Sequence, residues 1–284
     1  MSKSNLYLVP TDFSEVADCA VNHAAACAKV TGNEVRLLHI VNKDTEKKLG
    51  LDLEAVNERL TQQARELEQS HGIKVSFLAE EGSIFDTIGE IAQNEGAQLV
   101  FMGTHGVVGF QQKLLGAFAL KVISSSPVPV IVVQKKNIEK SGYDTVICPV
   151  DSTKEIKQKL SDTLAVAKVF NSEVHLYEYP ESDEFLNNAL KRNTSYARKF
   201  LAEGGIKTVV AEADAKEGDY YKQMIRYASQ ISADLMVIMS ESAKGIKEYI
   251  IGPEQEKIIN NDLQIAVMCV NPREVTQITD AIVY

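Results

Sequence analysis

Leu99-Val100-Phe101-Met102-Gly103-Thr104-His105-Gly106 decides the fold, together with Gly116-Ala117 after nine intervening residues. The first four residues form an apolar run, typical of a strand buried in a parallel sheet. A helical pattern covers about 111–125. A strand, a glycine-rich turn and a helix N-terminus favour anion binding, because glycines let backbone N–H groups approach and the helix dipole attracts negative charge. The stretch therefore predicts a phosphate site in an α/β fold.

The same order of strand and helix patterns occurs twice in the chain. The run Leu6-Tyr7-Leu8-Val9-Pro10-Thr11-Asp12 has a counterpart at 146–151, and each run ends in Pro-x-Asp before a helical pattern. Asp12 and Asp151 are 139 positions apart, which is about one domain length. The pattern predicts domains at 1–137 and 143–271, a polar linker over 134–142 and a C-terminal tail over 272–284. Because the linker is short, we expect the two halves to pack together.

Strands and helices alternate in both halves. Runs such as 130–133 are apolar on both faces, which predicts parallel strands covered by helices. The segment Ser152-x-x-Glu155 has the form of a capping box and predicts a helix start. The fold class expected is α/β, with two tandem, open, doubly wound parallel sheets. Strands are expected at 35–41, 73–79, 97–102, 128–133, 173–179, 206–213, 234–239 and 265–270. Helices are expected at 14–31, 51–71, 83–95, 111–125, 153–170, 183–204, 217–231 and 246–260.

Composition excludes several classes of function. A net charge of −9 without a basic patch argues against a nucleic-acid partner. No apolar run approaches the roughly 20 residues of a membrane span, and no signal-peptide pattern is present, so we expect a cytoplasmic protein. The four cysteines lack metal-ligand and C-x-x-C spacing and are expected to be buried structural thiols. No metal ligands and no catalytic residues are predicted.

Four motifs resemble the universal stress protein family in a tandem form, over about residues 5–134 and 143–271. They correspond to the family's opening turn, second strand, ATP-binding glycine pattern and closing strand: Pro10-Thr11-Asp12-Phe13-Ser14, Leu38-His39-Ile40-Val41, Gly103-Thr104-His105-Gly106 with Gly116, and 127–133. The resemblance implies a Rossmann-like, adenine nucleotide alpha hydrolase-like fold. It also implies an internal pseudo-dimer whose closing strands, 128–133 and 265–270, are adjacent.

The resemblance further implies an ATP site, with or without Mg²⁺, in the first half. Asp12 would bind the ribose or help to hold the metal ion, and the backbone of Val41 would face the adenine. Backbone N–H groups near Gly106, Gly116 and Ala117 would bind the phosphates. The complete implied set is Pro10, Thr11, Asp12, Val41, Met102, Gly103, His105, Gly106, Gly116, Ala117 and Phe118.

Both halves depart from the family pattern. Ala117 stands where the family has Ser or Thr, so a hydroxyl donor is missing, which would weaken binding by roughly 1.5–3 kcal/mol. In the second half the loop runs from Met239 to Gly245, followed by Gly252-Pro253, and has lost two glycines. Glu241 adds negative charge, and Pro253 lacks the N–H that Ala117 supplies. The second half is therefore predicted not to bind ATP in this way.

Simpler interpretations stay open. Glycines in a strand–helix turn are often present only because the backbone conformation requires them. Aspartate is also common at the start of a helix, and Asp151 is retained in the second half, which favours this simpler role for Asp12. The leading hypothesis is a stress-response protein that binds an adenine nucleotide and acts as a regulatory or sensor module, with an unknown protein partner and a homodimer as a further option. The alternatives are an interaction or scaffold protein without nucleotide binding, and a slow ATPase in which His105 would be the base.

Overall fold

A computed structural model describes residues 5–42, 47, 49–104, 117–138, 142–242 and 249–272. The strands are β1 Leu6–Pro10, β2 Glu34–Val41, β3 Val75–Glu81, β4 Leu99–Gly103, β5 Val130–Val133, β6 Thr145–Val150, β7 Glu173–Glu178, β8 Lys207–Glu212, β9 Leu235–Met239, β10 Glu241–Ser242, β11 Tyr249–Ile250 and β12 Ala266–Val270. The helices are α1 Glu15–Thr31, α3 Leu53–His71, α4 Ile84–Asn94, α5 Ala117–Ser125, α6 Ile156–Phe170, α7 Glu184–Glu203, α8 Tyr220–Gln230 and α9 Pro253–Ile259. Most boundaries fall within a few residues of those expected.

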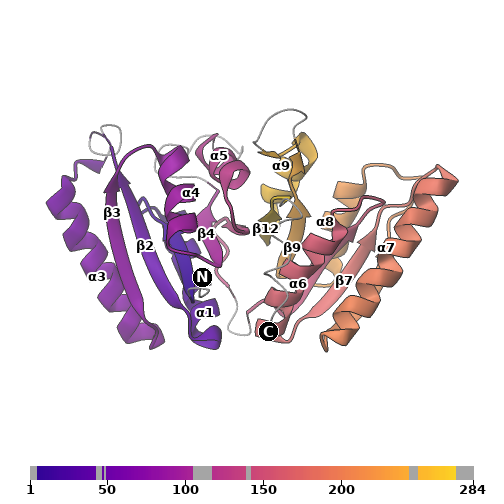
Figure 1. The fold of residues 1–284 in the computed structure, drawn as a ribbon, viewed down its shortest axis with the longest axis horizontal. Helices are drawn as coiled ribbons and strands as arrows, with labels where there is room; N and C mark the ends of the chain where they lie inside the picture. The colour runs from indigo at the N-terminus through magenta and orange to yellow at the C-terminus, as the bar shows by residue number, and fades with distance from the viewer. Residues whose placement is uncertain are drawn as a thin grey trace.

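The described residues form a 10-stranded sheet in the order β3-β2-β1-β4-β5-β12-β9-β6-β7-β8 (Figure 1). Read inward from either edge, the two halves have the same strand order. Neighbouring strands are parallel except at the centre, where β5 and β12 pair antiparallel with Ile131 opposite Met268. This architecture confirms the predicted α/β fold with two doubly wound half-sheets, and it confirms that the closing strands are adjacent. The domain boundaries themselves remain a prediction.

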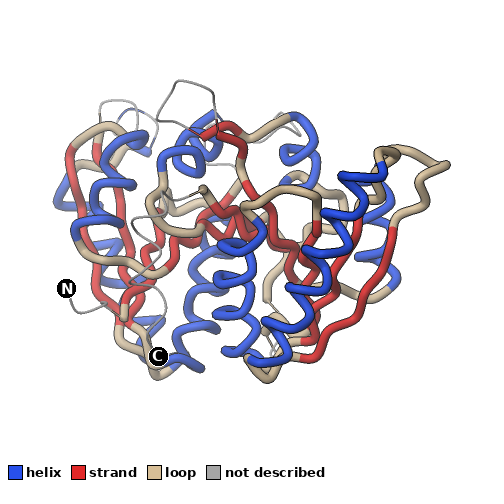
Figure 2. The backbone as a smooth tube through the Cα atoms, turned by 45° about the vertical axis from the view of Figure 1, so that its right-hand side comes forward, coloured by secondary structure: helices blue, strands red, loops and turns tan. Residues whose placement is uncertain are grey.

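Helices cover both faces of the sheet, because successive strand residues point to opposite sides and both sets are apolar. In β1, Tyr7 and Val9 belong to the core beneath α1, α3, α6 and α7. Leu6 and Leu8 belong to the opposite core, beneath α4, α5, α8 and α9. Each core continues through both halves, so the halves are packed into one body. On the first face, α1 and α6 lie side by side (Figure 2).

The described part of the linker, 134–138, docks onto α1. The Nε2–H group of the His23 imidazole donates to the Lys136 carbonyl at 3.0 Å, and Nδ1 accepts from the Tyr143 hydroxyl at 2.7 Å. The Cys19 thiol donates to the same carbonyl at 3.2 Å. Burial lowers the pKa of His23 to about 4, so the ring is neutral and can both donate and accept. The linker is thus a packed element, in line with the expected close packing of the halves.

All four cysteines are free and buried, which confirms the prediction of buried thiols. Burial raises the pKa of the Cys19 thiol to about 11 and also raises the pKa values of Cys27, Cys148 and Cys269. Because the thiolate is the reactive form of cysteine, these shifts keep the thiols inert.

Two local predictions were wrong. The helix expected over 246–260 begins only at Pro253, and residues 249–250 form the strand β11. Proline lacks an N–H and disfavours helical backbone in the residue before it, so it can start this helix but not continue an earlier one. Ser152 does not cap α6, which begins at Ile156; its hydroxyl donates to Glu181 at 3.2 Å instead.

Candidate nucleotide site

The strand order reverses beside β1, which pairs with β2 on one side and with β4 on the other. Ligands of open α/β sheets bind in the crevice at the carboxyl ends of the strands at such a reversal. The register Leu8↔Val100 aligns the two strand ends, so Asp12 follows one strand and Gly103 ends its neighbour. The fold therefore brings together the carboxyl-end members of the predicted set, namely Pro10, Thr11, Asp12, Met102 and Gly103.

The turn between β1 and α1 is held by its own side chains. The Thr11 hydroxyl oxygen accepts from the Phe13 N–H at 3.0 Å, and Asp12 Oδ1 accepts from the Ser14 N–H at 3.1 Å. Ser14 Oγ then caps α1 by accepting from the Ala17 N–H at 3.2 Å. Phe13 has a φ of 62°, a left-handed conformation that a bulky residue adopts only where its surroundings enforce it. The half-buried Asp12 carboxylate is thus presented from a fixed backbone.

Aromatic stacking fixes the same turn from the side of α3. The Phe13 ring stacks on His39 with centroids 4.9 Å apart, and the Arg59 guanidinium lies 4.4 Å from the centre of the Phe13 ring. His39 Nδ1 lies 2.8 Å from the Thr11 carbonyl oxygen and donates to it. Burial lowers the pKa of His39, which favours the neutral ring. Phe13 and His39 each lie in a motif of the sequence, but this stack was not predicted, because only the fold brings Arg59 to it.

Gly103 has a packing role. A Cβ atom at this position would lie 2.7 Å from Cγ1 of Val16 in α1, closer than real Cβ contacts allow. The absence of a side chain therefore lets α1 approach the end of β4. Packing against Val16 therefore explains why residue 103 is a glycine without invoking a ligand. This agrees with the simpler interpretation, in which the glycines of this turn serve backbone geometry.

Val41 and Met102 are mostly core residues, with 4% and 7% of their surfaces exposed. The Val41 carbonyl already accepts from the Gly82 N–H at 3.2 Å, within the extension of the β2–β3 ladder. A carbonyl oxygen has two lone pairs, so a second donor can still be accepted there. The contact of the Val41 backbone with adenine stays a prediction.

The glycine loop lies largely outside the described residues, which include none of the predicted residues His105, Gly106 and Gly116. Ala117 and Phe118 are the first two residues of α5. At the equivalent helix of the other half, the first residue is Pro253. Ala117 and Pro253 are thus the first described residues of matching helices, and of the two only Ala117 has an N–H.

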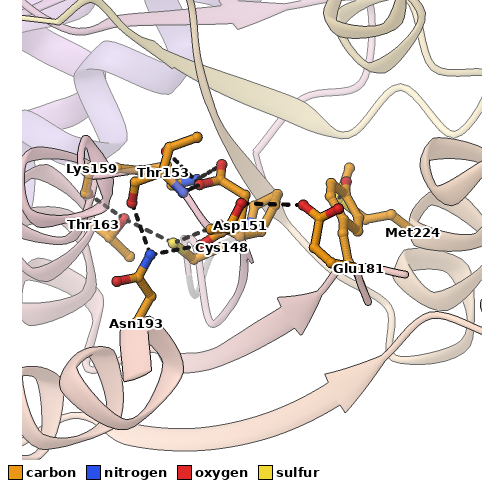
Figure 3. Close-up of polar contacts among 11 residues, drawn as sticks. Cys148, Asp151, Thr153, Lys159, Thr163, Glu181, Asn193 and Met224 are labelled. Atoms are coloured by element: carbon orange, nitrogen blue, oxygen red, sulfur yellow. Dashed lines mark hydrogen bonds and ion pairs between the residues drawn. The ribbon is translucent and has the colours of Figure 1, made fainter. Parts of the chain in front are cut away.

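The second half uses the equivalent aspartate differently (Figure 3). Asp151 Oδ1 accepts from both the N–H and the hydroxyl of Thr153, at 2.9 and 2.5 Å. Asn193 of α7 donates to the carbonyls of Asp151 and Thr153, both at 2.8 Å. Lys159 of α6, only 3% exposed, places its ammonium 3.9 Å from Asp151 Oδ2. The repeat offset aligns Lys159 with the fully buried Ala20, a signal that the sequence analysis did not use.

Tyrosines fill the second half beside this turn. The ring of Tyr179, one residue beyond β7, stacks on Tyr220 with centroids 5.5 Å apart and meets the edges of neighbouring rings. Its hydroxyl donates to the Met224 sulfur at 3.3 Å, and the Tyr220 hydroxyl donates to the Pro180 carbonyl at 3.1 Å. The strand register aligns Tyr179 with Ile40 of the first half. Side chains thus occupy space at the second-half carboxyl ends.

A groove of about 390 Å³ lies elsewhere, between α1 and α3. Phe13 and Arg59 line one part of it, and polar residues such as Gln63 and Glu66 line much of the rest. None of the predicted site residues lines this groove. The groove shares Phe13 with the turn that carries Asp12 and extends from there between α1 and α3.

Within the part of the chain that the structure describes, no group of three or more His, Cys, Asp and Glu side chains could hold a metal ion. In the same part of the chain, no helix is both long and apolar enough to cross a membrane.

Comparison with known proteins identifies relatives. The model of the Universal stress protein family matches residues 7–134. Universal stress protein MJ0577 of Methanocaldococcus jannaschii is 34% identical over 161 residues, an alignment that covers 48% of this chain and 98% of that protein. Universal stress protein MJ0531 of the same organism is 33% identical over 149 residues, covering 48% of this chain and 86% of that protein.

A solved structure supports the fold over both halves. A universal stress protein from Archaeoglobus fulgidus has a TM-score of 0.77 with 22% sequence identity, and the match covers 95% of this chain and 100% of that one. At this identity the likeness concerns the fold alone. The family model and the sequence relatives, which are matched over most of their own length, show that the chain belongs to the universal stress protein family.

Proposed function

We propose that the first half binds an adenine nucleotide, ATP with Mg²⁺, in the crevice between β1 and β4. The observation that carries the proposal is the meeting of Asp12, on its rigid turn, with the end of β4 at the reversal of strand order. The N-terminus of α5 supplies backbone donors suited to phosphate. Asp12 is an anion and therefore suits ribose hydroxyls or a metal ion better than a phosphate oxygen.

The second half is proposed to be a structural partner without a nucleotide. Its aspartate is already bonded to Thr153 and faces the buried ammonium of Lys159. Its helix starts with Pro253, which has no N–H to offer. One nucleotide per chain is therefore expected. Bound nucleotide would bias a surface that a partner protein reads, so the chain acts as a regulatory or sensor module in a stress response within the cytoplasm.

One observation favours a second candidate, an interaction protein that binds no nucleotide. Gly103 is explained by the approach of Val16, so part of the glycine pattern needs no phosphate. Ala117 also lacks the hydroxyl that the family pattern would place at the phosphates. Both candidates share the fold and differ only in whether the crevice is filled.

Calorimetric titration of the nucleotide-stripped protein with ATP and Mg²⁺ separates them. We expect one site per chain, weakened about tenfold by Asp12→Asn through loss of a hydrogen bond to charge. The matched variant Asp151→Asn should leave affinity unchanged. Absence of saturable heat would overturn nucleotide binding and support the interaction protein, whereas two sites would refute the structural role of the second half. Phosphate release by wild type and His105→Ala, measured on the same samples, tests for slow hydrolysis.

A further inference from the structure

Asn271 of the second half caps a helix of the first half. This residue follows β12 and is 7% exposed. Its Nδ2 group donates to the carbonyls of Ile123 and Ser126, at 2.6 and 2.9 Å. Ile123 belongs to the last turn of α5 and Ser126 directly follows the helix, where carbonyls lack the partners of a continuing helix. The Ile123 carbonyl also accepts the Ser126 N–H at 3.3 Å. The end of α5 is therefore tied to the opposite half by two hydrogen bonds.

The Asn271 amide is itself held on the second-half side. Its Oδ1 accepts from the Ser240 hydroxyl at 2.5 Å, at the end of β9. Its main-chain carbonyl accepts from Gln158 Nε2 of α6 at 2.6 Å. With donor and acceptor atoms both engaged and the residue buried, the side chain has one fixed orientation. It joins α6 and β9 of the second half to α5 of the first.

We infer that Asn271 is a positioning residue for the nucleotide site of the first half. The inference rests on the proposed function, in which the N-terminus of α5 at Ala117 faces the phosphates. A nine-residue helix is about 14 Å long and moves as a rigid rod, so fixing its C-terminus fixes the direction of its N–H groups. The two amide donors at its C-terminus also complement the helix dipole. The second half thereby contributes to a site that it does not line.

The pseudo-symmetric residue provides a matched control. Gln134 follows β5, and its Nε2 group donates to the carbonyls of Ile259 and Asn261, at 3.3 and 2.8 Å. It thus caps α9 of the second half from the first half. The two amides make equivalent contacts across the same junction, but only the helix that Asn271 caps begins at the proposed phosphate site. A general loosening of the junction would follow from changing either one.

The test compares Asn271→Asp with Gln134→Glu by titrating the full chain, below its unfolding transition, with ATP–Mg²⁺ and with adenosine. Each substitution turns two attractive contacts into carboxylate–carbonyl repulsion. Asn271→Asp should weaken ATP binding about five- to tenfold and adenosine binding by less than about twofold, because only the phosphates meet α5. Gln134→Glu should change both affinities by less than about twofold while lowering the melting temperature.

The possible outcomes distinguish a failure of this inference from a failure of the proposed nucleotide binding. If wild type binds no ATP, the proposed function and this inference both fail. If wild type binds ATP and Asn271→Asp binds it equally well, only the inference is overturned. Equal losses in both variants, or equal losses for ATP and adenosine, also overturn it by indicating general loosening. Should Asn271→Asp not fold, Asn271→Ala removes the donors without adding charge, and a selective loss of ATP affinity of about threefold is expected.

Discussion

Asp12 and Asp151 occupy the same position in the two halves, directly after the first strand, yet their surroundings differ. Asp12 Oδ1 accepts the backbone N–H of Ser14 in its own turn, and Ala20 of α1 is fully buried. Asp151 accepts two bonds from Thr153, and the buried ammonium of Lys159 stands at the position equivalent to Ala20. The positive charge near Asp151 is thus supplied by a side chain of the protein, Lys159.

This difference shows how one fold can serve as both a binding unit and a support. A half that supplies its own counter-charge and fills its carboxyl ends with tyrosines is stable without a ligand. A half that holds its aspartate half-buried on a rigid turn, beside the reversal of strand order, suits the binding role that we propose for it. Equivalent substitutions should therefore affect the two halves differently. In the second half they should lower stability, and in the first half they should weaken ligand binding.

The largest expected effect concerns His23, which anchors the linker to α1 and whose repeat counterpart is Asp162. The pKa of His23 is about 4 in the folded protein and near 6.5 when unfolded. Between these values the unfolded chain binds a proton that the folded protein does not, so stability falls as pH drops from 6.5 to 4. This loss amounts to about 3 kcal/mol. Urea unfolding at several pH values measures it, and His23→Gln should flatten the slope in this window. An equally steep slope in His23→Gln would refute the assignment.

The second prediction contrasts the two aspartates in stability. Asp151→Asn leaves the Lys159 ammonium buried without an anion and should cost about 2 kcal/mol of unfolding free energy, somewhat less than a fully buried pair because Asp151 is 37% exposed. Asp12→Asn should cost less than about 1 kcal/mol, since the asparagine amide oxygen can still accept from the Ser14 N–H. Chemical denaturation without nucleotide measures both. Equal losses would mean that the two turns do not differ in internal compensation.

The third prediction concerns the strand ends that face these turns. Gly103→Ala forces a Cβ against Val16 and should destabilise the protein by about 1–2 kcal/mol. The corresponding residue of the second half, at the end of β9, is Met239, which already has a long side chain. Met239→Leu conserves volume and should cost less than about 1 kcal/mol. Thermal unfolding compares the two variants, and a neutral Gly103→Ala would remove the packing explanation for this glycine.

The sequence predicted most of the sheet because its strands carry a local signal. Val130-Ile131-Val132-Val133 is apolar on both faces, which is typical of a strand covered by helices on both sides. The helix expected over 246–260 was wrong because its apolar spacing continued across Gly252-Pro253, where the proline sets a new start. The existence of elements was therefore more predictable than their boundaries.

The candidate site was predictable where residues lie close together in sequence or follow neighbouring strands, as Asp12 and Gly103 do. The turn around Asp12 is local, and its side chains bond to backbone two or three residues away. The Asn271 cap joins residues separated by 145 and 148 positions, and no periodicity records such a pair. Lys159 left a signal in the repeat alignment with Ala20, but lysine is rarely buried, and only the fold places its ammonium beside Asp151.

The smallest effect is expected from the residue that most distinguishes the halves. Lys159→Met keeps an unbranched side chain and removes the ammonium, whose desolvation in a 3% exposed position offsets its attraction to Asp151. We expect a change in unfolding free energy of less than about 1 kcal/mol, in either direction. In this background Asp151→Asn should also become nearly neutral, so a double-mutant cycle would give a coupling of about 2 kcal/mol. Chemical denaturation of the four variants measures it. A coupling near zero would show that Lys159 does not compensate Asp151, and the contrast between the two turns would then rest on Thr153 and Asn193 alone.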